Sequence, residues 1–335
     1  MILVTGGTGL VGSHLLYFLL KDGNAVRAVH RSSSDLQLVK KVFSYYSEEP
    51  ETLFKQIEWI EADITDIPAL LDAFHGVTHV YHAAAYISFN PKHYYKLKKA
   101  NIEGTANIVN LCLANQIQKL CYVSSVATLG KSLNNQLIDE ETAWNPEEKN
   151  SVYAITKYGA EMEVWRGTQE GLDAVIVNPG VILGSGDWNS GSGIIIKLGA
   201  RGIPFYTGGG IGLVDVQDVV RAMIDLMISG ITNEKFVLVG HNVTYKDLLT
   251  SLSRKLSAKP PKKKLPRFIL NIFASVDWFF SKLLGTKRKL LKATVKSLYK
   301  NSFYDSSKIK ERLNFSFTPL EETLNRVVEN YRKES

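Results

Sequence analysis

Short runs of β-branched and apolar residues alternate with longer amphipathic segments over the first 240 residues of the chain. The first run, Ile2–Thr5, is followed by Val11–Leu20, where leucines recur on one helical face, so the pattern predicts a strand and then a helix. Further strands are predicted in the same way, with helical segments between them: Ala25–His30, Ile57–Ala62, Thr78–His82, Lys119–Ser124, Ala174–Asn178 and Lys235–Val239. This alternation predicts the α/β class, with a doubly wound parallel sheet covered by helices on both faces.

The segment between the first strand and the first helix is rich in glycine. In a strand–turn–helix unit, Gly6 permits the tight turn, Gly9 lets the backbone approach a pyrophosphate, and Gly12 lets the helix pack closely on the sheet. The N-terminus of the helix adds free N–H groups and a partial positive charge. The motif therefore predicts a dinucleotide site, whose cofactor-binding residues are Gly6, Thr8, Gly9, Leu10, Val11 and Gly12.

The last predicted strand comes after a long excursion of the chain, so the first domain is expected to be discontinuous. We assign residues 1–180 and 213–240 to a Rossmann-type NAD(P)-binding domain. Residues 181–212 and 241–335 are then expected to form a smaller, mostly helical substrate-binding lobe. Its place is over the carboxyl ends of the strands, where open α/β sheets bind their ligands.

The end of the second strand bears on the choice of cofactor. A site for NAD usually places Asp or Glu there to hold the ribose 2′-hydroxyl, whereas this chain has His30, Arg31 and three serines. A guanidinium matches the oxygens of a 2′-phosphate, so Arg31 favours NADP(H), with NAD(H) as the alternative. After the third strand, Asp63 is expected to accept a hydrogen bond from the adenine amino group, and Asp66 is equally well explained as a helix cap.

The composition is that of an ordinary globular protein, with 45% hydrophobic and 22% charged residues. No signal-like segment precedes the first strand, and no apolar run approaches the ~18 residues of a membrane span, so we expect a cytoplasmic protein. The two cysteines, Cys112 and Cys121, lie in apolar surroundings and are expected to be buried free thiols. No metal site is expected.

Tyr153 and Lys157 in "SVYAITKYGAE" are four residues apart and therefore share one face of a predicted helix. An ammonium close to a phenol lowers the pKa of the phenol, so the pair can move a proton to or from a substrate oxygen. Ser124 and Ser125 lie where the fifth strand ends, at the ligand-binding edge of the sheet. A hydroxyl there can stabilise the negative charge that develops on that oxygen.

Seven stretches follow one another in a fixed order: the glycine turn, Asp63, "HAAA" at 82–85, Asn101 in "NIEGT", Ser124–Ser125, Tyr153 with Lys157, and "NPGVILG" at 178–184. Together they resemble the extended short-chain dehydrogenases/reductases, the NAD-dependent epimerase/dehydratase superfamily, over about residues 1–240. The resemblance implies that Tyr153 is the general acid/base, that Lys157 lowers its pKa and holds the nicotinamide ribose, and that Ser125 is the catalytic serine. Ser124 stays a second candidate, because the doublet permits a shift of one residue.

The same resemblance implies the rest of the cofactor groove, with Asn178 beside the nicotinamide and Asn101 as a helix-organising residue. Close packing explains the small residues at 83–85 equally well. Asp215 and Asp218 in "GLVDVQDVVRA" are expected to cap a helix and hold the second lobe in place. Beyond the glycine turn, the implied cofactor-binding residues are Arg31, Asp63, Ile64, Ala83, Ala84, Ala85, Ser124, Tyr153, Lys157, Pro179, Gly180 and Val181.

Two departures from the family pattern narrow the expected reaction. Dehydratases of the family follow the serine with Thr-Asp-Glu, whereas Val126, Ala127 and Thr128 follow Ser125 here. Epimerases usually carry an Arg that meets the substrate diphosphate, and "GGGIGLVDV" at 208–216 has none. The chain is similar to the dihydroflavonol-reductase-like and 3β-hydroxysteroid-dehydrogenase-like branch, which implies hydride transfer between nicotinamide and a ketone or secondary alcohol of a small hydrophobic substrate.

Two alternatives stay open: a nucleotide-sugar epimerase, and a cofactor-binding module without catalysis. For the oxidoreductase, aromatic residues are expected to line an apolar substrate pocket. The candidates for substrate contact are Tyr86 and Phe89 in the loop after the fourth strand, Trp188, and Ser125 at the point of reaction. Packing between the lobes explains the aromatic residues equally well.

Positive charge is concentrated near the C-terminus, where residues 254–300 hold 14 Lys or Arg and one acidic residue, Asp277. Within this segment one helical face carries Ile269, Ile272, Phe273, Val276, Phe280 and Leu283. We expect this face to pack on the substrate lobe, and contact with an anionic membrane surface is the alternative. No recognition motif accompanies the charge, so nucleic acid is not an expected partner. The expected partner is a small-molecule substrate, and a homodimer stays open.

Overall fold

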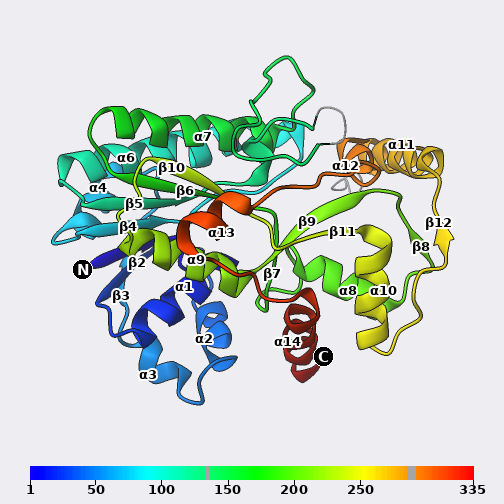
Figure 1. Cartoon of the computed structure of the whole chain (residues 1–335), viewed down its shortest axis with the longest axis horizontal. Coiled ribbons are helices and arrows are strands. Elements are labelled where there is room, and N and C mark those ends of the chain that lie inside the picture. Colours follow the sequence, from blue (N-terminus) through cyan, green and yellow to red (C-terminus); the bar gives the residue numbers. More distant parts are fainter. Residues whose placement is uncertain (133–135, 285–291) are drawn as a thin grey trace.

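The computed structural model describes residues 1–132, 136–284 and 292–335, with side chains left out for 279–294. Its centre is a parallel sheet of seven strands in the order β10-β6-β5-β4-β1-β2-β3 (Figure 1). The strands are β1 Ile2–Thr5, β2 Val26–His30, β3 Glu58–Glu61, β4 His79–His82, β5 Lys119–Val123, β6 Ala174–Pro179 and β10 Glu234–Leu238. They coincide with the seven predicted strands to within one residue at each end, so the predicted doubly wound sheet is confirmed.

Helices cover both faces of the sheet, because the central strands β1, β4, β5 and β6 are buried along most of their length. One buried cluster joins the sheet to helices α1 Leu10–Lys21, α2 Gln37–Ser44, α9 Val216–Ile228 and α13 Ser307–Leu313. The cluster on the other face includes side chains of α4 Ile67–Phe74, α6 Gly104–Ala114 and α7 Val152–Gln169. Short helices α3 Pro50–Phe54 and α5 Tyr94–Leu97, and a π-helical turn Lys98–Glu103 that leads into α6, complete this half. Cys112 and Cys121 are buried free thiols, as expected.

The remaining elements form a second lobe at the carboxyl end of β6 (Figure 1). Its main sheet has the order β11-β9-β7, with β7 Val181–Leu183, β9 Gly210–Asp215 and β11 His241–Thr244. Two further strands, β8 Phe205–Tyr206 and β12 Lys263–Lys264, pair with each other. The helices of the lobe are α8 Gly193–Arg201, α10 Tyr245–Lys255, α11 Arg267–Leu284, α12 Lys292–Ser297 and α14 Leu320–Lys333. α13 departs from the expected division, because it packs against β10 of the large sheet although it lies within 241–335.

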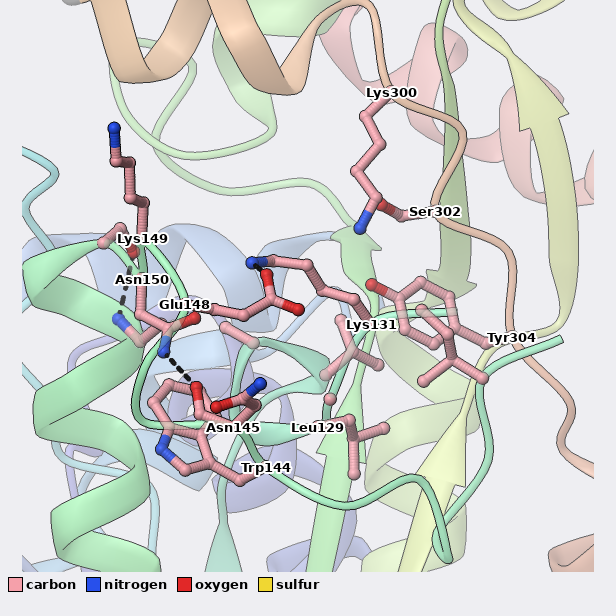
Figure 2. Close-up of a pocket in the computed structure, with 16 residues that line it drawn as sticks. Leu129, Lys131, Trp144, Asn145, Glu148, Lys149, Asn150, Lys300, Ser302 and Tyr304 are labelled. Carbon is pink, nitrogen blue, oxygen red and sulfur yellow. Dashed lines mark hydrogen bonds and ion pairs between the residues drawn. The ribbon is translucent and has the colours of Figure 1, made fainter. Parts of the chain in front are cut away.

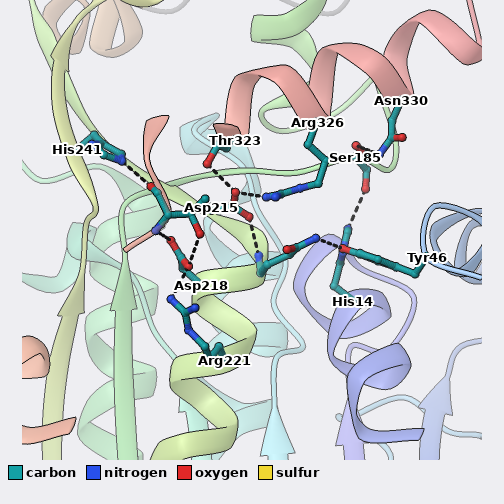
Figure 3. Close-up of polar contacts among 12 residues, drawn as sticks. His14, Tyr46, Ser185, Asp215, Asp218, Arg221, His241, Thr323, Arg326 and Asn330 are labelled. Carbon is teal, nitrogen blue, oxygen red and sulfur yellow. Dashed lines mark hydrogen bonds and ion pairs between the residues drawn. The ribbon is translucent and has the colours of Figure 1, made fainter. Parts of the chain in front are cut away.

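Two aspartates hold the end of the chain against this framework, as expected for Asp215 and Asp218 (Figure 3). Asp215 caps α9 by accepting a hydrogen bond from the N–H of Gln217 at 2.8 Å. Its second oxygen accepts from the hydroxyl of Thr323 at 2.6 Å and pairs with Arg326, both on α14. Since the Asp215 carboxylate is fully buried, these partners replace the water that it loses on folding.

His14 on α1 joins the two halves in the same region (Figure 3). Its Nε2 is 2.9 Å from the carbonyl oxygen of Ser185, and its Nδ1 contacts the Tyr46 hydroxyl. The carbonyl can only accept, so Nε2 carries the proton and the ring is neutral with Nδ1 as acceptor. Burial lowers the pKa of His14 to about 4, against a smaller opposing effect of the Ser185 hydrogen bond.

The expectation that the apolar face of α11 packs on the substrate lobe is wrong. Ile272 and Phe273 are each 57% exposed and Val276 is 45% exposed. Helix α11 contacts α12, and Ala274 is its buried apolar residue in the part whose side chains are described. The predicted positions Phe280 and Leu283 lie outside the described side chains.

Asp215→Ala should lower the free energy of unfolding by about 2–4 kcal/mol, because it removes a helix cap and leaves Arg326 without its buried partner. Chemical denaturation followed by circular dichroism measures the change. Glu329→Gln on the outer face of α14 is the control, since the Glu329–Lys333 pair is exposed and its loss should leave the denaturation midpoint unchanged. Equal midpoints for Asp215→Ala and wild type would contradict the anchoring role.

The stability should fall as the pH drops below about 6.5, partly because of His14. Its folded-state pKa of about 4 lies below the unfolded value of 6.5, so the unfolded chain takes up the proton first. The contribution is complete above pH 6.5 and decreases by up to about 1.4 kcal/mol per pH unit on the way down to pH 4. Denaturation at several pH values across this range measures the free energy of unfolding. In His14→Gln this free energy should depend less on pH than in wild type. An equal pH dependence in the two proteins would exclude His14 as a source.

Candidate active site

The turn between β1 and α1 has no room for side chains at two of its glycines. Gly6 has φ +72°, and a Cβ there would lie 2.6 Å from the backbone nitrogen of Ala84. A Cβ at Gly12 would lie 2.1 Å from the carbonyl oxygen of Gly6. The sequence must therefore keep glycine at both positions if β1, α1 and the segment after β4 are to meet.

The N-terminus of α1 is open to an anion. Gly9 is its N-cap, no side chain caps the helix, and its first turn holds no acidic residue. The N–H of Gly9 bonds to the carbonyl of Gly6 at 2.9 Å, which closes the turn. Thr8, Leu10 and Val11 complete the turn and the start of the helix. Bare backbone beside free helical N–H groups fits the pyrophosphate of a dinucleotide.

The ends of β2 and β3 present the residues expected to contact the adenosine half of a cofactor. Arg31 is exposed directly after β2. The carboxylate of Asp63 accepts from the backbone N–H of Thr65 at 2.9 Å and from its hydroxyl at 2.7 Å. Asp66 caps α4 through the N–H of Ala69, which agrees with the simpler explanation of that residue.

Ile64 and the alanines after β4 lie close to the glycine turn and its neighbours. A Cβ at Gly104 would lie 2.6 Å from the side chain of Ile64, which fixes the start of α6 against the end of β3. The N–H of Ala83 bonds to the carbonyl of Thr5 at 3.1 Å, and Ala84 approaches Gly6. Ala85 is exposed. The small size of this segment follows at least in part from close packing.

The two serines after β5 point to different partners. Ser124 is buried, and its hydroxyl donates to the carboxylate of Glu161 at 2.6 Å. Ser125 accepts from the N–H of Ala127 at 3.1 Å, and its side chain lies beside Tyr153, whose pKa it lowers. The geometry thus pairs Ser125, and not Ser124, with the tyrosine.

Tyr153 lies in the first turn of α7, a helix that begins where Ser151 accepts a hydrogen bond from the N–H of Ala154. Burial raises the pKa of the Tyr153 phenol, and the nearby side chain of Ser125 opposes this effect. The ring of Phe89 packs edge-on against that of Tyr153, with centroids 5.4 Å apart. The phenol thus lies between a serine hydroxyl and an apolar ring.

Lys157 follows one turn later and is almost fully buried. Its ammonium donates to the Tyr122 hydroxyl at 2.6 Å and to the carbonyl of Val123 at 2.9 Å. Burial lowers the pKa of Lys157 to about 7, and the negative charge of Glu161 opposes the shift. The expected lowering of the Tyr153 pKa is not seen, because burial has the larger effect and the ammonium is bonded to Tyr122.

The sequence analysis missed Glu161. Its position four residues after Lys157 on the same helix places both side chains on one face, and this spacing could have identified it. One oxygen of Glu161 accepts from Ser124, from the Thr128 hydroxyl at 2.7 Å and from the Asn178 amide at 3.0 Å. Asn178, expected beside the nicotinamide, thus also joins the end of β6 to the end of β5. The second missed residue is Tyr122, whose aromatic type gave no sign that its hydroxyl would hold the lysine.

The segment after β6 is held closely. Pro179 is the last residue of β6, and Val181 is the first of β7. The N–H of Gly180 between them donates to the carbonyl of Leu238 at 3.0 Å, and a Cβ there would lie 2.6 Å from the carbonyl oxygen of Gly212. This segment therefore reaches the catalytic edge from the side opposite to β4.

The expected substrate residues do not all come together. Phe89 is 51% exposed over Tyr153, and the neighbouring Tyr86 has both backbone polar groups bonded to the side chain of Asn101, at 2.7 and 3.0 Å. Asn101 therefore organises this loop. Trp188 is buried and donates to Glu334 at 2.7 Å, so it belongs to the packing of α14 and does not extend the surface around Tyr153.

A cavity of about 190 Å³ adjoins this site (Figure 2). Its walls include Val126–Ala127 directly after Ser125, and Ser151 and Ala154 on either side of Tyr153. Apolar parts of Leu129, Trp144 and Tyr304 form another section of the lining.

The cavity is also cationic. Lys131, Lys149 and Lys300 line it, with Glu148 paired to Lys131. Burial and the positive charges of Lys300 and Lys296 lower the pKa of Lys131. The three lining lysines thus outnumber Glu148, the one carboxylate in the lining.

Comparisons with known proteins agree with this arrangement. Residues 2–238 match the model of the NAD dependent epimerase/dehydratase family. The chain is 30% identical to the "Putative dihydroflavonol 4-reductase" of Synechocystis sp., over 96% of this chain and 91% of that protein. It is 27% identical to the sterol demethylase protein B of Methylococcus capsulatus, over 79% and 77% of the two chains.

Among solved structures, the UDP-glucose 4-epimerase of Thermotoga maritima, determined with UDP-glucose, superposes with a TM-score of 0.78. The two chains are 25% identical, and the match covers 99% of each. The family match covers most of the chain and includes the glycine turn, Ser125 and Tyr153. The chain belongs to the NAD dependent epimerase/dehydratase family and is an NAD(P)-dependent enzyme of the extended short-chain dehydrogenase/reductase type.

Proposed function

We propose that this enzyme is an NADP(H)-dependent oxidoreductase that transfers a hydride between nicotinamide and a ketone or secondary alcohol of a small, mainly apolar substrate. The observation that carries the proposal is the position of the Ser125 side chain beside the buried phenol of Tyr153. Lys157 lies one turn further along the same helix, and the bare glycine turn lies at the same edge of the sheet. An acid/base group, an oxygen-binding hydroxyl and a pyrophosphate site are what the reaction requires.

Several features support a dinucleotide with a 2′-phosphate. The open N-terminus of α1 would take the pyrophosphate, and Arg31 would pair with the 2′-phosphate. Asp63 would bind the adenine, and the segments at Ala84 and Gly180, after β4 and β6, would line the groove on the nicotinamide side. When bound, the nicotinamide supplies the hydride for reduction of a ketone and accepts it in the reverse direction.

Tyr153 would hold the proton that moves. Because burial raises the pKa of its phenol, the group is protonated at neutral pH, the form that donates to a carbonyl oxygen as negative charge develops. Ser125 would donate a second hydrogen bond to the same oxygen and stabilise that charge. This combination favours reduction of a ketone as the working direction.

Lys157 would assist the proton transfer from Tyr153 through its positive charge. With a pKa of about 7, it carries positive charge in a large fraction of molecules at neutral pH. A buried positive charge near the phenol stabilises the phenolate that remains after proton transfer. Tyr122 and Val123 hold the ammonium in place, and the family resemblance adds the ribose of the nicotinamide as its further partner.

The surroundings of the reaction point support an apolar substrate. Phe89 is 51% exposed and packs against Tyr153, and Ile87 in the same loop is 64% exposed. On the side of β9, a Cβ at Gly210 would lie 2.4 Å from the ring of Phe303, and one at Gly212 2.7 Å from that of Tyr304. Aromatic rings therefore cover the stretch in which epimerases usually carry an arginine. The names of the two curated relatives agree with a ring-bearing apolar substrate.

A nucleotide-sugar epimerase is the second candidate, and the cationic cavity is the observation that favours it. Lys131, Lys149 and Lys300 offer positive charge to a diphosphate without an arginine. The Thermotoga maritima neighbour, whose structure holds UDP-glucose, supports the same alternative. If the enzyme interconverted UDP-sugars without net consumption of cofactor, the epimerase would be the correct function.

NADPH should bind more tightly than NADH, and Arg31→Ala should remove most of that preference. Loss of a charge-assisted hydrogen bond to a phosphate predicts a roughly tenfold or larger loss of NADPH affinity, with NADH affinity unchanged. Fluorescence titration with both cofactors measures this. Lys21→Ala, an exposed cation at the far end of α1, is the control. Equal affinities for the two cofactors in wild type would refute the NADP(H) preference.

Tyr153→Phe should reduce kcat with a panel of ketones by about 10²–10⁴-fold and leave cofactor affinity unchanged, because the variant lacks only the transferable proton. NADPH oxidation followed at its absorbance band measures the rate. Tyr158→Phe is the matched control, since Tyr158 lies on the same helix but stacks on Trp144 at 4.6 Å. A rate within a few-fold of wild type would assign the proton to another group, and tight cofactor binding without turnover in wild type would favour the non-catalytic module.

A further inference from the structure

Helix α11 presents an apolar surface that the described part of the chain does not cover. Phe268 is 64% exposed, Ile272 and Phe273 are 57% exposed, and Val276 is 45% exposed. Phe268, Ile272 and Val276 recur every four residues and therefore lie on one side of the helix, with Phe273 beside them. We call these four residues the α11 face. Isolated exposed apolar residues are common, but a contiguous group with two phenylalanines indicates a contact surface.

Exposed cations precede the α11 face along the chain and lie next to it. Lys262, Lys263, Lys264 and Arg267 are all exposed, and Lys296 is exposed on α12, which packs against α11. The whole segment 254–300 holds 14 Lys or Arg and one acidic residue. Apolar side chains and positive charge are thus combined on one side of the second lobe, where α11 and α12 form an outer edge (Figure 1).

This combination excludes the simpler partners. Two copies of the chain that paired through the α11 face would bring two strongly basic segments together, which costs free energy. A nucleic acid would match the charge, and its bases can stack on phenylalanine, but it offers no apolar partner for the aliphatic Ile272 and Val276. An anionic lipid surface matches both, because acyl chains receive the apolar residues and lipid headgroups attract the lysines.

We propose that α11 docks this enzyme on anionic membrane surfaces, with the α11 face inserted among the acyl chains and the flanking lysines at the headgroups. The helix would lie in the plane of the interface. No helix within 1–132, 136–284 and 292–335 is both long and apolar enough to cross a bilayer. Binding is therefore expected to be peripheral, reversible and dependent on salt.

The helix is attached to the body of the protein at its N-terminal end and through α12. The hydroxyl of Tyr299 donates to the carbonyl of Leu265 at 2.6 Å, just before α11 begins. Ala274 on α11 and Val295 on α12 are both fully buried. The attachment buries Ala274 and leaves the four large residues of the α11 face outside, as a surface-docking helix requires.

Co-sedimentation of the full chain with vesicles tests the proposal. We expect binding to phosphatidylcholine vesicles that contain phosphatidylserine, little binding to phosphatidylcholine alone, and loss of binding as salt rises, since charges are screened beyond about 10 Å at 0.1 M. The triple variant Phe268→Ser, Ile272→Ser, Phe273→Ser should bind roughly a hundredfold more weakly. Ile228→Ser is its control, because Ile228 is 80% exposed at the end of α9.

The charge requirement is tested separately. Lys263→Gln with Lys264→Gln should weaken binding by roughly thirtyfold, at about 1 kcal/mol for each lysine at the surface. The matched control is Lys21→Gln with Lys55→Gln, two exposed lysines of the other half. Three outcomes would overturn the proposal: no binding to anionic vesicles, equal binding by the triple serine variant and wild type, or a lipid-free dimer that the triple variant converts to monomer.

Discussion

The geometry of the catalytic edge depends on one buried carboxylate, that of Glu161. A charge in the interior is tolerated only when hydrogen bonds replace water, and here donors from β5, from the turn after it and from β6 meet one oxygen. Ser124 must point inward to supply one of them. The backbone at Ser125 is extended, so the next side chain points the opposite way, toward Tyr153. The inward role of one serine therefore sets the outward role of the other.

The sequence alone predicted the seven-stranded sheet because buried parallel strands are apolar runs of limited length, separated by helices of regular period. It also predicted the edge at which Ser125, Tyr153 and the glycine turn gather, since parallel strands all end there. It could not decide between Ser124 and Ser125, because their order along the chain does not say which one faces inward. That information lies in Glu161, a residue on a helix more than 30 positions away.

The lysine shows a second limit of spacing arguments. Four residues of separation place Tyr153 and Lys157 on one helical face, and the structure agrees. Spacing says nothing about how much water each group loses, and burial shifts both pKa values toward the neutral forms. At neutral pH, Tyr153 is therefore protonated, and Lys157 carries its positive charge in only part of the molecules.

Amphipathic periodicity has the same ambiguity, because it identifies an apolar face but not what the face meets. In α2 that face is buried against the sheet through Val39, Val42 and Phe43, whereas in α11 it is exposed. The segment that follows α12 contributes Lys300, Ser302 and Tyr304 to the lining of the cavity beside Ser125. The chain thus runs from α12, which packs against α11, directly into this wall of the cavity.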